Sequence, residues 1–248
     1  MVLPGEHLTR ACSRRADRSY LGAIAAWRAA DAPSRWAARN ERMMSTLVYR
    51  SALTLAAIGA AARGLVVILA FVRTFLNRRQ FVSFRFGWIE CLVSVEPLLL
   101  LAMGWWLFEG IRASDSPSVS RMSAAVLGAG LVLSGWVLVV WTFFSWPSIF
   151  AGHGILSGHR LITTGAYGVV RHPVYLGALL IWIGLPLAFT HVTTFALAVL
   201  YVIPGYLLYL RSEEAMMLAS FGDEYREYQR QVPRLLPFPS GKRSASDR

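Results

Sequence analysis

The stretch MSAAVLGAGLVLSGWVLVVWTFFSW, residues 122–146, decides the class of fold, because it runs for 25 residues without one charged side chain. A helix needs about 20 apolar residues to cross the hydrocarbon core of a bilayer. Residues 122–146 are therefore predicted to form a transmembrane helix. The composition agrees, since 55% of the 248 residues are hydrophobic and 16% are charged, against about 25% charged in soluble proteins. Intrinsic disorder, a disulfide scaffold and a collagen-like chain are excluded.

Four further stretches are apolar and long enough to be spans: residues 51–72, 89–108, 174–190 and 193–210. His191 lies in the short linker between the last two, which predicts a helical hairpin over residues 174–210. The predicted fold class is an all-α integral membrane protein with about five transmembrane helices, this C-terminal hairpin, and a cytosolic cofactor-binding loop and tail.

Three charged residues fall inside the predicted spans: Arg63, Glu90 and Glu96. A charge in a span either faces the interior of the bundle or snorkels to the membrane surface. We expect Arg63 to snorkel and Glu90 to lie at the interface.

The chain is predicted to have four parts: a basic arm over 1–46, three transmembrane helices over 47–146, a C-terminal region over 147–238, and a disordered tail over 239–248. The arm is expected to be disordered or an amphipathic helix on anionic lipid. Eight arginines fall within residues 1–42, and five spans would place them outside the cell. One hypothesis is that the natural chain starts at Met43 or Met44.

The basic residues are distributed unequally between the two sides of the membrane. Five spans put the loop at 147–173 and the tail from Arg211 on one side, and that tail carries seven of the 25 Lys and Arg residues. The loop on the opposite side has only Arg112 and Arg121. The positive-inside rule makes the loop and tail cytoplasmic. We expect a multi-pass protein of the bacterial inner membrane, with its active site on the cytoplasmic side.

Polar residues gather at this cytoplasmic mouth, in GHRLITTGAYGVVRHPVYLG over residues 158–177 and in Glu213-Glu214 at the end of the last span. Pro173 suits the first turn of a helix, whose free N–H groups would face the loop. The loop could wrap a charged, nucleotide-like ligand; the alternative is a basic membrane anchor. The hairpin returns Glu213-Glu214 to the same surface, so acids and bases converge as an active site requires. Cys12 and Cys91 form no CxxC motif, and no metal site is expected.

The order GAY (165–167), RHPVYLG (171–177), Glu213-Glu214 and FGDEYREYQRQVPRLLP (221–237) resembles the C-terminal signature of the isoprenylcysteine carboxyl methyltransferase family and the related phospholipid methyltransferases. The resemblance covers about residues 146–238. It implies a membrane methyltransferase that uses S-adenosylmethionine in a cytosolic pocket, while a lipid-like substrate enters from the bilayer.

The resemblance also implies roles for individual residues. The cofactor contacts would be His159, Arg160, Leu161, Ile162, Tyr167, His172, Pro173, Val174, Tyr175 and Glu213. Arg211 or Arg234 would bind a carboxylate acceptor, whereas Glu214 would be the base for an amine acceptor. Two positions depart from the prenylcysteine enzymes: Gly152 stands where they have a polar amide, and Tyr209 where they have a substrate-binding Arg.

The predicted function is methyl transfer to a lipid-like or prenylcysteine-type carboxylate, or to an amine. The expected partners are the lipid bilayer and an amphiphilic small molecule or lipid, with no nucleic acid. Two alternatives stay open: a non-catalytic binding or transport module of the same fold, and a sterol-type membrane reductase.

Overall fold

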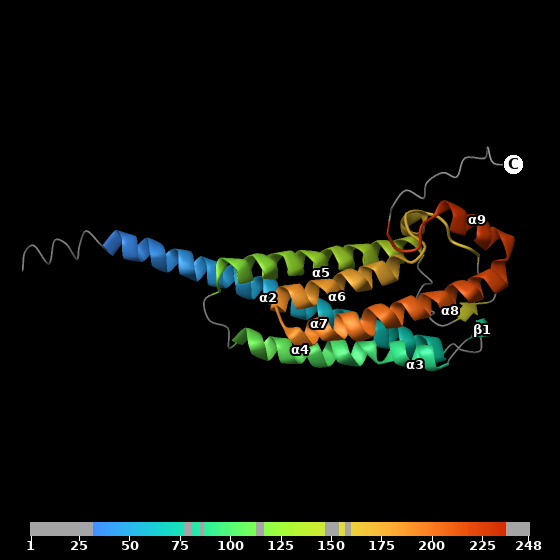
Figure 1. Ribbon diagram of the computed structural model, residues 1–248, viewed down its shortest axis with the longest axis horizontal. Coiled ribbons are helices and arrows are strands. Elements are labelled where there is room, and N and C mark those ends of the chain that lie inside the picture. Colours follow the sequence, from blue (N-terminus) through green and yellow to red (C-terminus); the bar gives the residue numbers. More distant parts are fainter. Residues whose placement is uncertain are drawn as a thin grey trace, which may run out of the picture. The chain divides into compact units, whose positions relative to one another are not determined.

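The computed structural model describes residues 32–76, 81–84, 87–112, 117–146, 154–156 and 160–236 (Figure 1). The chain forms two compact units, Met1–Leu47 and Val48–Arg248, and every residue of the site described below belongs to the second. The predicted tail and most of the predicted arm lie outside the described residues, as does His159.

The described chain is almost entirely helical, which confirms the predicted fold class. The helices are α2 (Ala32–Leu76), α3 (Trp88–Ser94), α4 (Glu96–Arg112), α5 (Val119–Ser145), the 3₁₀ turn η2 (Gly165–Gly168), α6 (Pro173–Phe189), α7 (Val192–Leu197), the π-helical turn η3 (Ala198–Val202), α8 (Ile203–Phe221) and α9 (Asp223–Gln231). Two short strands, β1 (Phe81–Phe84) and β2 (Gly154–Leu156), pair antiparallel. The hydropathy pattern gave no sign of this pair.

Four helical stretches are long and apolar enough to cross a membrane: Ser34–Leu76, Trp88–Ile111, Val119–Ser145 and Val192–Phe221. The apolar helix α6 has 17 residues and extends about 25 Å, slightly less than a hydrocarbon core of about 30 Å. Each predicted span matches one of these five helical stretches, although the spans 122–146 and 174–190 each end one residue beyond the helix. The count of five crossings itself stays a prediction.

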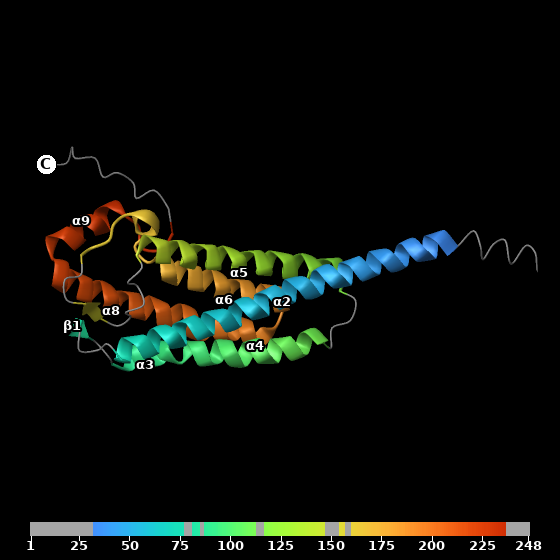
Figure 2. The same cartoon turned by 180° about the vertical axis from the view of Figure 1, so that it is seen from behind.

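Helices α5 and α6 lie side by side in both views (Figures 1 and 2). Their glycines allow this, because a Cβ on Gly135 would stand 2.5 Å from the carbonyl oxygen of Gly177, and one on Gly184 would stand 2.6 Å from that of Gly128. Small residues let helices approach closely in lipid, where no hydrophobic effect drives them together. The α5–α6 pair holds the loop between them over the end of the bundle.

Prolines break two of the predicted spans. Pro97 has no N–H to continue a helix, and the helix is interrupted at Val95, between α3 and α4. Pro204 follows the π-helical turn η3, which accommodates a residue that cannot donate to the preceding turn. The interruption at Val95 places Glu96 at the start of α4.

The prediction that Arg63 snorkels is wrong, because its residue is only 6% exposed. Glu96 is also buried, and its Oε1 accepts a hydrogen bond of 2.9 Å from the indole of Trp182. Arg63 is attracted by the negative charge of Glu96, which favours the interior of the bundle over its surface.

Candidate active site

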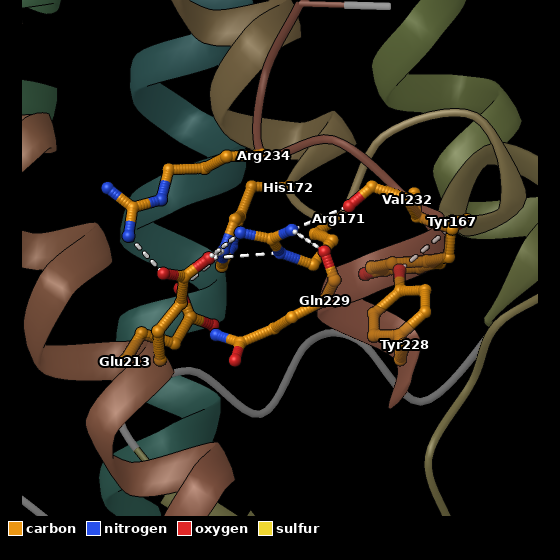
Figure 3. A network of polar contacts seen from close by, with 9 residues as sticks. Tyr167, Arg171, His172, Glu213, Tyr228, Gln229, Val232 and Arg234 are labelled. Atoms are coloured by element: carbon orange, nitrogen blue, oxygen red, sulfur yellow. Dashed lines mark hydrogen bonds and ion pairs between the residues drawn. The ribbon is translucent and has the colours of Figure 1, made fainter. Parts of the chain in front are cut away.

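The loop before α6 and the segment after α9 are joined by backbone hydrogen bonds. The N–H of Arg171 donates to the carbonyl of Pro233 at 2.8 Å, and the N–H of His172 donates to that of Arg234 at 3.2 Å. Both segments thereby come to the C-terminal half of α8, where Glu213 and Glu214 lie. Figure 3 shows side chains from loop and tail converging there.

The loop is also fixed to α5. Gly165 adopts a positive φ of 63°, which glycine tolerates best, and this turn brings the N–H of Ala166 within 2.9 Å of Ser145 Oγ. On the other side, the hydroxyl of Tyr228 in α9 donates to the carbonyl of Tyr167 at 2.7 Å. The loop is therefore tied to one helix before it and one after it.

Glu214 is the centre of a buried ion network. Its Oε1 accepts hydrogen bonds from Nε and Nη2 of Arg171, at 3.1 and 2.8 Å, and lies 3.2 Å from Nε2 of His172. Its Oε2 accepts from Nη2 of Arg234. Both carboxylate oxygens are thus occupied by cationic groups, and only 7% of the side chain is exposed.

Arg171 connects this network to α9. Its remaining nitrogen, Nη1, donates to the carbonyls of Gln229 and Val232, at 3.0 and 2.5 Å. These carbonyls lie at the C-terminal end of α9, where a helix leaves acceptors without partners and carries partial negative charge. One guanidinium therefore holds Glu214 and the end of α9 together.

His172 lies between the two acids. Burial alone would lower the pKa of its imidazole, but the carboxylates of Glu213 and Glu214 outweigh burial and raise it. Its Nδ1 is 3.6 Å from Oε2 of Glu213. The ring is therefore biased toward the protonated form, which places a positive charge at the N-cap of α6.

Glu213 differs from its neighbour because successive residues of a helix point about 100° apart. Glu214 faces the loop and tail, whereas Glu213 lines a cavity. Its Oε2 is buried and has no hydrogen-bond partner among the described residues. Glu213 is therefore the acid of the pair that has bonding capacity left for a ligand.

The cavity has a volume of about 230 Å³, many times the roughly 10–15 Å³ that one water needs. Eight of the ten predicted cofactor contacts line it: Leu161, Ile162, Tyr167, His172, Pro173, Val174, Tyr175 and Glu213. Arg160 is exposed and does not line it.

The three residues predicted to be catalytic take different positions. Glu214 and Arg234 belong to the ion network and do not line the cavity, and Arg211 is exposed on α8. The structure thus brings Glu214 and Arg234 to the site but leaves Arg211 outside it.

Sequence reasoning missed the contribution of the membrane helices to this cavity. Arg63 of α2, Glu96 of α4, and Tyr206 and Tyr209 of α8 all line it. The available signal was the presence of charged residues inside apolar spans, which marks functional positions in membrane proteins.

The sequence of this chain is similar to those of known methyltransferases. The sequence profile of the phospholipid methyltransferase family matches residues 123–224. A methanethiol S-methyltransferase of Crocosphaera subtropica is 26% identical over 207 residues, which cover 73% of this chain and 75% of that protein. A methanethiol S-methyltransferase of Bradyrhizobium diazoefficiens is 38% identical over 93 residues, 38% of this chain and 35% of that one.

A protein-S-isoprenylcysteine O-methyltransferase of Xenopus laevis is 28% identical over 150 residues, which cover 57% of this chain and 51% of that protein. These relatives confirm the predicted resemblance to the isoprenylcysteine carboxyl methyltransferase family. The stretch 123–224 contains Arg171, His172, Glu213 and Glu214, but neither Arg63 nor Arg234.

Proposed function

We propose that this chain, a membrane methyltransferase of the kind found in the relatives above, takes a methyl group from S-adenosylmethionine and transfers it to a small thiol at the cytoplasmic face of a bacterial inner membrane. One observation carries the proposal. Glu213, whose Oε2 has no hydrogen-bond partner among the described residues, lines a cavity walled by tyrosines at the end of a transmembrane bundle.

The residues around the cavity fit S-adenosylmethionine. The carboxylate of Glu213, which lines the cavity, suits the donor's ammonium or ribose hydroxyls. The rings of Tyr175 and Tyr209 lie with their centroids 5.6 Å apart on the cavity wall, and aromatic faces attract cations. When bound, S-adenosylmethionine supplies an electrophilic methyl group on a positively charged sulfur.

The protein's part in this chemistry is to position groups and exclude water. Tyr167 closes one side of the cavity, and burial raises the pKa of its hydroxyl, so that this group stays neutral. The network around Glu214 keeps the tail against the loop. We assign Glu214 and Arg234 to this positioning role, because both oxygens of Glu214 accept hydrogen bonds from cationic groups and neither residue lines the cavity.

A thiol is the acceptor that we favour. Two of the relatives reported above are named methanethiol S-methyltransferases, and a thiol needs no strong base once a nearby cation stabilises its thiolate. The carboxylate of a prenylcysteine and the amine of a phospholipid are the alternatives that the other relatives offer. Among the described residues, the acids that line the cavity are Glu96 and Glu213. Each lies close to a cation, Arg63 or His172, whereas a base for an amine would need to lie away from both.

The distribution of basic residues supports a cytoplasmic position for the site. The described part of the chain brings Arg171, Arg230 and Arg234 to the end of the bundle where the cavity lies. At the opposite end, Arg121 lies in the first turn of α5, the helix whose other end adjoins the loop. The larger number of basic residues favours the cytoplasm for the cavity.

The test uses the full chain purified in lipid nanodiscs. We expect S-adenosylmethionine to bind in calorimetry, and labelled methyl to pass to methanethiol or ethanethiol rather than to a prenylcysteine or a phospholipid. Glu213→Gln should lose donor binding, whereas the exposed Glu224→Gln should retain it. Binding without transfer to any acceptor would favour a non-catalytic module, and NADPH binding in place of S-adenosylmethionine would favour a reductase.

A further inference from the structure

The cavity continues far beyond the predicted cofactor contacts, along one face of α2. Arg63, Val66, Val67, Ala70, Phe71 and Thr74 line it, with the spacing of three to four residues that belongs to one side of a helix. Eleven residues of helix extend about 16 Å. The cavity therefore runs from the loop at Thr74 into the membrane-spanning part of the bundle, and it ends at Arg63.

The cavity also follows α8, from Glu213 to Tyr206. These residues are two helical turns apart and both line the cavity, so about 10 Å of helix separates them. Tyr175 lies between them, with ring centroids 5.9 Å from His172 and 5.5 Å from Tyr206. The cavity thus has two polar ends joined by aromatic rings.

The deep end holds two buried donors, Arg63 and Tyr206, beside the carboxylate of Glu96. Nε of Arg63 and the hydroxyl of Tyr206 are buried, and neither has a hydrogen-bond partner among the described residues. Arg63 forms no direct ion pair with those residues; the charge of Glu96 acts on it from a longer distance, and Glu96 also interacts with Tyr206 and accepts the indole N–H of Trp182.

A buried guanidinium without an ion pair is costly, and a charge kept in a membrane span is a functional signal. An anion at this end would satisfy both donors. The walls beside them, at Val66, Val67, Val93 and Pro97, are apolar. The ligand that fits is therefore a small monoanion with a short apolar group.

We propose that Arg63 and Tyr206 form the acceptor subsite and bind the thiol as its thiolate, an inference that rests on the proposed function. The thiol gives its proton to the solvent on binding. The thiolate sulfur then uses a lone pair to form a bond to the methyl carbon, and the bond from that carbon to the donor sulfur breaks, leaving its electron pair on that sulfur. The products are a methyl thioether and a neutral donor thioether.

The test measures binding in the absence of the methyl donor. Ethanethiol is titrated into the protein in nanodiscs by calorimetry at pH 8, in buffers of different ionisation enthalpy, which reports protons released per thiol bound. We expect more than half a proton released from the wild type. In Arg63→Gln we expect no release and at least tenfold weaker binding, in Arg63→Lys partial retention of both, and in Tyr206→Phe an intermediate loss.

Arg73→Gln is the matched control, since it removes one positive charge from an exposed position of the same helix that does not line the cavity. It should bind ethanethiol like the wild type. A purely structural Arg63 would lower thermal stability in Arg63→Gln but leave proton release unchanged, and that result overturns the proposal, as does binding without release in the wild type. Failure of the proposed function is a separate outcome, seen as a wild type that binds no S-adenosylmethionine.

Discussion

Nε and Nη2 of Arg171 both donate to Oε1 of Glu214, at 3.1 and 2.8 Å, although the two residues are 43 positions apart in the chain. The side chains are only 10% and 7% exposed. The same guanidinium also caps the end of α9 through the carbonyls of Gln229 and Val232. One side chain of the loop thus determines where the last membrane helix and the tail lie relative to each other.

Replacing Arg171 should separate the tail from the loop. Removal of one partner from a buried ion pair costs about 3–5 kcal/mol, because the other charge stays buried. We expect Arg171→Gln to lower the unfolding temperature and to increase hydrogen exchange over residues 223–236. Arg171→Lys should give only partial recovery, since a lysine cannot contact the carboxylate and the helix end together. The exposed pair of Arg226 and Asp223 provides the control, and Arg226→Gln should change neither measurement.

Changing Glu213 and Glu214 to Gln, one at a time, should affect different properties: the first should affect S-adenosylmethionine binding and the second the unfolding temperature. Glu214→Gln leaves the cations of Arg171 and Arg234 without their anion, so we expect a large fall in unfolding temperature. Glu213→Gln removes a carboxylate that lines the cavity and makes one ion pair, at 3.6 Å from His172, so we expect loss of S-adenosylmethionine binding with a much smaller fall in unfolding temperature than in Glu214→Gln. The reverse pattern would mean that we have assigned the two acids to the wrong roles.

Protonation of His172 should make stability depend on pH. The imidazole has a raised pKa in the folded protein, against about 6.5 in the unfolded chain. A group whose pKa is raised on folding stabilises fully below its unfolded pKa, and the contribution is lost as the pH rises through the folded pKa. We therefore expect the unfolding temperature to fall from pH 6 upward. His172→Gln should show a smaller fall over the same range, and equal slopes would contradict this explanation.

The helices were predictable because length and hydropathy are local properties. Residues 122–146, 174–190 and 193–210 each become helix, and Pro173 begins α6 as its fixed φ indicates. The hairpin then made it predictable that the loop and Glu213-Glu214 would meet. These predictions needed no knowledge of how one helix packs against another.

The remainder depended on tertiary packing. Glu213 and Glu214 point about 100° apart around the axis of α8. Because they have the same side chain, the sequence alone does not indicate which of them faces the cavity. Arg63 could not be assigned to the cavity from the sequence, because snorkelling and burial leave the same pattern in an apolar stretch. The bonds from Arg171 to the end of α9 require a position for α9 that no local signal provides.

The turn at Gly165 offers a test of how closely the loop must contact α5. Any other residue there would be strained at φ 63°, and its Cβ would lie under 3.0 Å from both Cβ and Oγ of Ser145. We expect Gly165→Ala to destabilise the protein by about 1–3 kcal/mol and to weaken S-adenosylmethionine binding, because Tyr167 would be displaced from the cavity wall.

Gly222 also has a positive φ, but nothing lies within 4 Å of an added Cβ there. Gly222→Ala should therefore destabilise the protein less and leave S-adenosylmethionine binding intact. Gly130→Ala, on an open helical position, should be neutral or stabilise by up to about 1 kcal/mol. Calorimetric binding and thermal unfolding of the three variants would show whether contact with Ser145 matters beyond backbone strain, and equal losses in Gly165→Ala and Gly222→Ala would show that it does not.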